Sequence, residues 1–169
     1  TQPAAQRLAQ QRQRQQTHRQ RHPEIRIRQF AQLIHQEEFL FAELMQARDI
    51  NKMVEILQPQ VSDTPLLQNT PIMGRKSIDI LLINTVLPYQ YAYKKLQQKT
   101  DNDIIQLMEE IPAEDNSIIK QWKQLGQSIH SAADTQALLH LYQNYCQPHQ
   151  CYNCQVGSQI FAYKQLSIF

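Results

Sequence analysis

Apolar residues recur three or four positions apart along most of the chain that follows Arg21. This spacing is the period of one face of an α-helix, so it predicts helices. The first two stretches break near Gln36, and we expect two successive helices there. Their apolar positions are Ile27, Phe30, Leu33 and Ile34 in the first and Leu40, Phe41, Leu44 and Met45 in the second.

Polar residues that can cap a helix precede most of the later apolar stretches. A side-chain oxygen at the N-cap accepts a hydrogen bond from an unpaired backbone N–H, and Asp, Asn and Ser suit this position. Gly126 is placed to close the helix that carries Trp122. Three prolines fall within residues 58–74 and predict a long loop. The expected N-caps are Asp49, Asp101 or Asp103, Asp115 or Asn116, and Ser131.

The stretch from Ile78 to Leu87 is apolar on every side, which predicts a buried element. Its length favours a helix, while its Ile, Val and Thr content keeps a buried strand as the alternative. Ser77 is in position to cap it. Pro88 lacks a backbone N–H, so we expect it to break or kink the element.

The composition agrees with a helical fold, because Val and Thr are sparse beside Leu, Ile, Ala, Gln and Lys. A chain of 169 residues, 41% hydrophobic and 19% charged, can bury one core. We predict an all-α fold, an irregular multi-helix bundle with a Cys-containing C-terminal turn, in a single helical domain over residues 23–169. Ile83, Trp122, Leu141 and Tyr145 lie on apolar faces and should be largely buried.

The sequence contains no sign of membrane insertion or secretion. No apolar run reaches the roughly 18 residues that a membrane-spanning helix needs, and the polar N-terminus lacks the apolar stretch of a signal peptide. Three cysteines, an odd number, argue weakly against a secreted disulfide framework. We therefore expect a cytoplasmic protein with no membrane partner.

Residues 1–22 form a basic, Gln- and Arg-rich segment with Leu8 as its only large apolar residue. Without an apolar stripe it cannot dock strongly on a core, so we interpret it as a linker or a solvated helix. Its positive charge makes contact with the phosphates of a nucleic acid the alternative, although it has no aromatic residue for base stacking. The candidate contact residues are Arg7, Arg12, Arg14, Arg19 and Arg21.

The most specific candidate for chemistry is the series Cys146, Cys151 and Cys154. Three thiolates with this spacing can form most of a tetrahedral zinc site, and His149 or His140 can supply the fourth ligand. The same cysteines can also be inert thiols that pack a turn, or Cys151 and Cys154 can be a redox pair. Packing is the interpretation that we favour, so no cofactor is expected and zinc is the alternative.

No catalytic residue is predicted. The acidic residues after Pro112, Glu114 and Asp115, lie where a helix should begin, and acids there favour the helix dipole. His130 and Asp134 can pair across one turn, but no nucleophile stands near them in the sequence, so a cap or a surface contact is the preferred interpretation.

A series of short motifs carries a resemblance to a known family. The motifs are Ile83-Asn84-Thr85-Val86 with Pro88, Ile111-Pro112-Ala113-Glu114 with Asn116 and Trp122, Ser131-Ala132 with Asp134 and Gln136-Ala137-Leu138, and Tyr145-Cys146 with Cys151, Cys154 and Gly157; Arg26-Ile27 and Gln29-Phe30 also fit. Together they resemble the C-terminal half of a bacterial family that is catalogued as a domain of unknown function. The loop from Val61 to Thr70 departs from the family pattern.

The resemblance implies a longer parent protein whose N-terminal half looks like a restriction-endonuclease-like core, and it carries over no activity. The favoured function is therefore a non-catalytic helical accessory module that packs on that N-terminal half. A nucleic-acid-binding module of a nuclease-like protein and a zinc-stabilised structural module are the alternatives.

Overall fold

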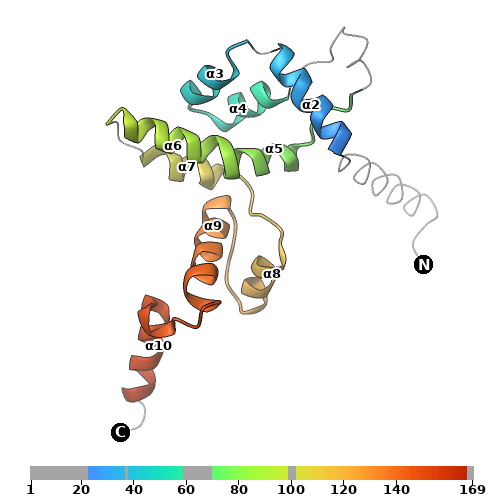
Figure 1. Ribbon diagram of the computed structural model, residues 1–169. Coiled ribbons are helices and arrows are strands. Elements are labelled where there is room, and N and C mark those ends of the chain that lie inside the picture. Colours follow the sequence, from blue (N-terminus) through green and yellow to red (C-terminus); the bar gives the residue numbers. More distant parts are fainter. Residues whose placement is uncertain (1–22, 37, 59–69, 99–101, 167–169) are drawn as a thin grey trace, which may run out of the picture. The chain divides into compact units, whose positions relative to one another are not determined.

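The computed structural model describes residues 23–36, 38–58, 70–98 and 102–166, with the side chains of Asn102 and of residues 161–166 left out. Every regular element in these ranges is helical (Figure 1). The only extended pairing described is an isolated antiparallel bridge between Pro112 and Ser131. The predicted all-α fold is confirmed. None of the helices described is long and apolar enough to cross a membrane.

The chain divides into two compact units, Thr1–Ile104 and Ile105–Phe169. The expectation of one domain over residues 23–169 stays a prediction. The first unit contains α2 (Pro23–Gln36), α3 (Leu40–Gln46), α4 (Ile50–Leu57), α5 (Arg75–Leu81), the π-helical turn η1 (Leu82–Val86) and α6 (Leu87–Leu96). α7 (Asn102–Glu110) begins in it. The second unit continues with α8 (Ser117–Gln124), α9 (Ala132–Leu141), the π-helical turn η2 (Tyr142–Cys146), the 3₁₀ turn η3 (Cys151–Asn153) and α10 (Gln155–Leu166).

The core of the first unit is built mainly from α4 and from the long helical run of α5, η1 and α6. α4 begins at the predicted cap, since the Asp49 carboxylate accepts a hydrogen bond from the Lys52 N–H at 2.9 Å. Its apolar positions then recur at helical spacing, and all of them except Val54 are buried. The buried apolar residues of these elements are Ile50, Met53, Ile56, Leu57, Ile78, Leu82, Ile83, Val86 and Leu87.

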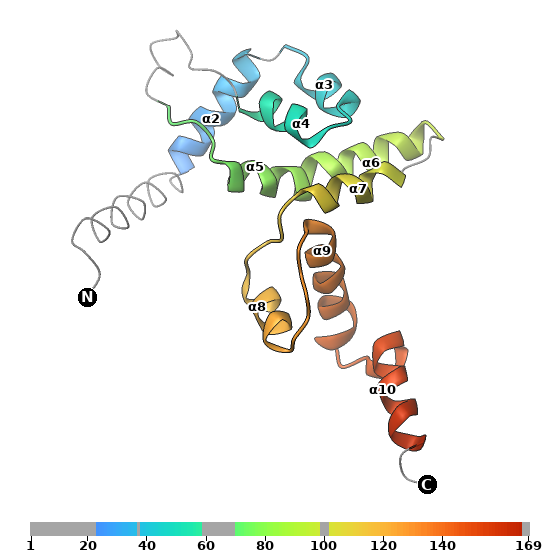
Figure 2. The same cartoon turned by 180° about the vertical axis from the view of Figure 1, so that it is seen from behind.

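Pro88 does not break this run, so the expectation of a break is corrected. The chain passes from α5 into α6 as one continuous coil in both views (Figures 1 and 2). The turn before Pro88 is π-helical, and the Leu87 N–H donates to the Leu82 carbonyl. A widened turn of this kind accommodates a residue that has no N–H to donate. Ser77 was also wrongly assigned as the cap, because Gly74 occupies the N-cap and Ser77 lies inside α5.

Local signals set the helix ends of the second unit as expected. The Asn116 side chain caps α8, and Ser131 and Asp134 form a reciprocal capping box at the start of α9. Gly126 has φ +87° and ends α8, with its N–H donated to the Lys123 carbonyl and the Gln127 N–H donated to that of Trp122. This is the Schellman arrangement, in which a left-handed residue satisfies the last carbonyls of a helix.

The second unit has a smaller buried set than its apolar faces predict. Its buried residues are Leu107, Ile111, Ile119, Ile129, Ser131, Ala132, Thr135 and Cys154. Ile83, in the first unit, is buried as expected. Trp122, Leu141 and Tyr145 are only half-buried, so the expectation of large burial is corrected for these three. The bridge between Pro112 and Ser131 brings together the two ends of the segment that contains α8.

Candidate functional site

α2 presents its apolar side to solvent, which the sequence pattern did not predict. Ile27, Phe30 and Ile34 are 67%, 58% and 53% exposed. They are spaced by three and four residues, so they form one stripe along the helix. We call these three residues the α2 face. The side of α2 that is buried contains Leu33 together with two glutamines, Gln29 and Gln32.

Polar contacts hold α2 in this orientation. The Gln29 side-chain amide donates to the Pro71 carbonyl at 2.7 Å. The Arg26 guanidinium donates to the Gln29 side-chain oxygen at 3.3 Å and to the Ser77 hydroxyl at 2.9 Å. A buried amide of this kind must be hydrogen-bonded, so these contacts set the rotation of α2 about its own axis. Because these contacts hold the polar side of α2 inward, the α2 face points outward.

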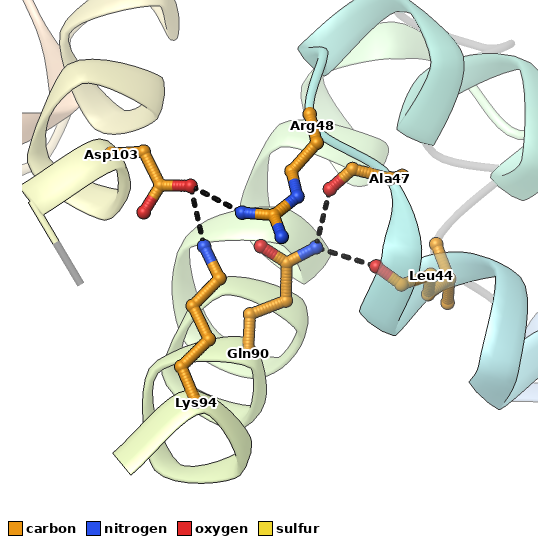
Figure 3. A network of polar contacts seen from close by, with 6 residues as sticks. All are labelled: Leu44, Ala47, Arg48, Gln90, Lys94 and Asp103. Atoms are coloured by element: carbon orange, nitrogen blue, oxygen red, sulfur yellow. Dashed lines mark hydrogen bonds and ion pairs between the residues drawn. The ribbon is translucent and has the colours of Figure 1, made fainter. Parts of the chain in front are cut away.

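A buried polar network ties the junction of α3 and α4 to α6 and to the start of α7 (Figure 3). The Gln90 side chain is 1% exposed, and its amide donates to the carbonyls of Leu44 and Ala47 at 2.5 and 2.9 Å. Lys94 is 4% exposed, and its ammonium lies 2.6 Å from Asp103 Oδ2. The Arg48 guanidinium reaches the same oxygen at 2.8 Å.

This network explains why a lysine is buried and how its charge is balanced. The hydrogen bond from Lys94 has the largest effect and lowers the pKa of Asp103. Burial has the next largest effect and raises that pKa, while the bond from Arg48 and the charge of Lys94 lower it further. Asp103 therefore remains a carboxylate and compensates the buried ammonium. Asp103 Oδ1 and Gln90 Oε1 are buried and accept no hydrogen bond from the described residues. The contacts join α6 to the junction of α3 and α4 and to α7, so they indicate a structural tie.

The three cysteines lie together in one compact turn of the second unit. Cys146 ends η2 and is half-buried, Cys151 begins η3 and is exposed, and Cys154 follows η3 and is 7% exposed. Burial raises the pKa of the Cys146 thiol, and the nearby charges of Cys154 and Cys151 raise it further. His149 is exposed in the same turn, with φ +58°.

Gly157 sets the shape of this turn. A side chain at position 157 would place its Cβ only 2.2 Å from the Cys151 carbonyl oxygen. The contacting atoms belong to the backbone, so they cannot move aside as the end of a side chain can. Only glycine therefore lets the first turn of α10 lie against the backbone of Cys151.

The geometry gives no support to the predicted zinc site at Cys146, Cys151, Cys154 and His149. Among the residues that the structure describes, no three His, Cys, Asp or Glu side chains form a group that could hold a metal ion. All three cysteines are free thiols. His140, the other predicted ligand, contacts the Asn144 amide through its ring nitrogen at 3.1 Å. Zinc binding stays a prediction, without a preformed site to carry it.

The acidic candidates of the second unit act as caps and surface contacts, as expected. Asp134 accepts from the backbone N–H groups of His130 and Ser131 at 2.9 and 3.1 Å, and these bonds lower its pKa. Glu114 accepts from the Gln136 amide at 2.5 Å, and Asp115 lies 3.3 Å from Lys120. The hydroxyl that Asp134 contacts belongs to Ser131, its partner in the capping box of α9.

The candidate nucleic-acid contacts cannot be placed. Arg7, Arg12, Arg14, Arg19 and Arg21 all lie outside the described residues. Their contact with nucleic acid stays a prediction that depends on the charge of the sequence alone.

The described residues enclose no cavity of ligand size. The best-formed hollow, between α2 and the segment after residue 70, has a volume of about 10 Å³ and is lined by Gln29, Gln32, Pro71, Ile72 and Met73. That is the space of a single water molecule. Pockets that bind substrates are commonly some 300–1,000 Å³. The exposed α2 face and the cysteine turn are therefore the features of this chain on which a function can be built.

Comparison with known proteins identifies a family but assigns no activity. No curated protein and no solved structure matches the chain. A family model matches residues 5–117, which include all of the first unit's described helices and continue to the start of α8. The prediction of a family of unknown function is confirmed: the chain belongs to the family described as a protein of unknown function (DUF2851).

Proposed function

We propose that this chain is a non-catalytic helical module of a longer protein and that the α2 face packs against the N-terminal half of that protein. The observation that carries the proposal is the outward orientation of Ile27, Phe30 and Ile34 on a helix whose opposite side is held by polar contacts. Single exposed apolar residues are ordinary on protein surfaces, but an aligned apolar stripe indicates a contact surface.

The size of the α2 face favours a partner in the same polypeptide. Burying a large apolar side chain is worth about 1.5–3 kcal/mol, so three half-exposed residues supply on the order of 3–5 kcal/mol. Association of two separate proteins costs about 4–15 kcal/mol in lost freedom of motion, which such a stripe does not offset. A covalently linked partner is present at an effective concentration in the millimolar range. A weak stripe is then sufficient to hold the two halves together.

Hydrogen exchange tests this proposal in the parent protein and in the 169-residue chain. We expect the backbone amides of α2 to exchange more slowly in the parent, because the contact there suppresses local opening. The substitutions Ile27→Ser, Phe30→Ser and Ile34→Ser, made together, should remove that additional protection. They should leave the melting temperature of the isolated chain nearly unchanged, since the replaced side chains are mostly exposed.

Leu125 provides the matched control, because it is an apolar residue of the second unit that is 78% exposed. Leu125→Ser should leave the protection of α2 in the parent unchanged. Equal exchange of α2 in the parent and in the isolated chain would contradict the proposal. A concentration-dependent dimer of the isolated chain that the triple substitution abolishes would assign the α2 face to a second copy instead.

A further inference from the structure

We propose that Cys151 and Cys154 form a reversible disulfide by exchange with low-molecular-weight disulfides, with Cys151 as the attacking thiol and Cys154 as the resolving thiol. The turn that contains them supplies the three features that such a pair needs. One thiol is accessible, a second is covered, and the backbone already brings the two into range.

The backbone of η3 places the two cysteines at a distance that a disulfide can span. The Cys154 N–H donates to the Cys151 carbonyl at 3.3 Å, which closes a four-residue turn. The first and last Cα atoms of such a turn lie within about 7 Å, and disulfides join Cα atoms that are roughly 4.4–6.8 Å apart. In a 3₁₀ turn, side chains three residues apart lie on the same side. Formation of the Cys151–Cys154 disulfide therefore needs little movement of the backbone.

The solvent exposure of the cysteines determines which thiol reacts first. Cys151 is exposed and meets a dissolved disulfide directly, whereas Cys154 is 7% exposed and is shielded from it. Cys146 is half-buried, and burial raises the pKa of its thiol, so it is a poorer nucleophile near neutral pH. The first attack should therefore come from Cys151, and the covered Cys154 should react only with the sulfur that has become attached beside it.

The exchange balances without any further reactant. The Cys151 thiolate attacks one sulfur of the small disulfide, the S–S bond breaks, and one small thiol leaves with the proton that Cys151 lost. The Cys154 thiolate then attacks the Cys151 sulfur and releases the second small thiol. Two protein thiols have been oxidised to one disulfide, and one small disulfide has been reduced to two thiols.

Gly157 links this exchange to the start of α10. Because α10 lies against the Cys151 carbonyl only when residue 157 has no side chain, the position of η3 depends on that contact. Gly157→Ala should displace η3 from the first turn of α10 and uncover Cys154. The difference in solvent exposure between the Cys151 and Cys154 thiols should then be smaller, and Cys154 should react directly with alkylating reagents.

Oxidised glutathione is the probe for the test. The full chain is reacted with it at neutral pH, and the reaction is stopped with acid. The remaining thiols are then alkylated under denaturing conditions, and the modified cysteines are identified by mass spectrometry. The wild type should yield the Cys151–Cys154 disulfide with Cys146 still alkylated. Cys154→Ala should stop at a glutathione adduct on Cys151, because no resolving thiol remains. Cys151→Ser should react at least about tenfold more slowly, because the remaining thiols are covered. Cys146→Ser should behave as the wild type.

Three results would overturn the proposal. One is a stable glutathione adduct on the wild-type chain that does not go on to form the Cys151–Cys154 disulfide. Another is a disulfide that includes Cys146 in place of Cys151 or Cys154. The third is about one equivalent of zinc or iron in protein purified without added metal, with the thiols reacting only after chelation, since this would assign the cysteines to a metal site.

Discussion

Asp103→Asn should lower the free energy of unfolding by about 2 kcal/mol. The substitution preserves the shape of the side chain but removes the negative charge that balances Lys94, whose side chain is only 5% exposed. Removing one partner of a fully buried ion pair costs roughly 3–5 kcal/mol, because the other charge is left uncompensated. The expected cost is smaller here, since the Asp103 side chain is 35% exposed and water can screen part of the interaction. Urea denaturation near neutral pH measures the effect.

The same substitution should change how stability depends on pH. The pKa of Asp103 is lower in the folded protein than its ordinary value of 3.8, mainly through the hydrogen bond from Lys94. A carboxyl with a depressed folded pKa stabilises the fold above its unfolded pKa, and that contribution disappears as the pH falls through the folded value. The wild type should therefore lose part of its stability below about pH 4. Asp103→Asn should show a shallower loss in that range.

Two further variants separate the charge effect from general disruption. Lys94→Met removes the buried charge and retains most of the apolar stem, so it should cost less than Asp103→Asn, with Asp103 still bound by Arg48. Glu55→Gln removes an exposed ion pair with Lys52 and should change stability by less than about 0.5 kcal/mol. A larger cost for Lys94→Met than for Asp103→Asn would show that the lysine stem, and not its charge balance, sustains this part of the fold.

Gln90→Leu should destabilise the chain by about 2–4 kcal/mol. The Gln90 amide is the donor for two carbonyls at the C-terminal end of α3, those of Leu44 and Ala47. The last carbonyls of a helix have no partner within the helix. Leucine has nearly the volume of glutamine but cannot donate, so both carbonyls would be left buried at a cost of about 1–3 kcal/mol each. Chemical denaturation, with circular dichroism at helical wavelengths, measures the loss.

Gln124, an exposed residue of α8, offers the control for this change. Gln124→Leu should alter stability by no more than about 0.5 kcal/mol, because it removes no buried hydrogen bond. Gln90→Glu should cost more than Gln90→Leu, since a carboxylate would face the two carbonyls. If Gln90→Leu were as stable as the wild type, the two carbonyls would not depend on Gln90, and the junction of α3 and α4 would be held by its apolar residues alone.

Helix starts and ends could be predicted because they depend on interactions a few residues apart. Asp49, Asn116 and Ser131 cap the helices that they were expected to cap, and Gly126 ends α8. In each case the capping atom and the N–H that it binds belong to the same turn. The pairing of Cys151 with Cys154 has the same origin, since the two residues begin and end one four-residue turn.

Pro88 shows where a correct local rule produced a wrong structural expectation. The missing N–H of proline is a property of the sequence, but its consequence depends on the turn before it, which widens into a π-helical turn so that the helix continues. The two buried residues directly before it, Val86 and Leu87, hold the run against the core. Tertiary packing therefore decided that the proline would be accommodated.

The sequence by itself determined the all-α class and most helix boundaries, because each depends on composition or on contacts within a turn. Only the tertiary structure decided which side of α2 faces inward. Its apolar stripe and its glutamines both have helical periodicity, and the choice between them depends on Pro71 and Ser77, distant in sequence. The burial of Lys94 was likewise invisible, since lysine is seldom buried unless paired. Its partner Asp103 comes from another helix and becomes its neighbour only when the chain folds.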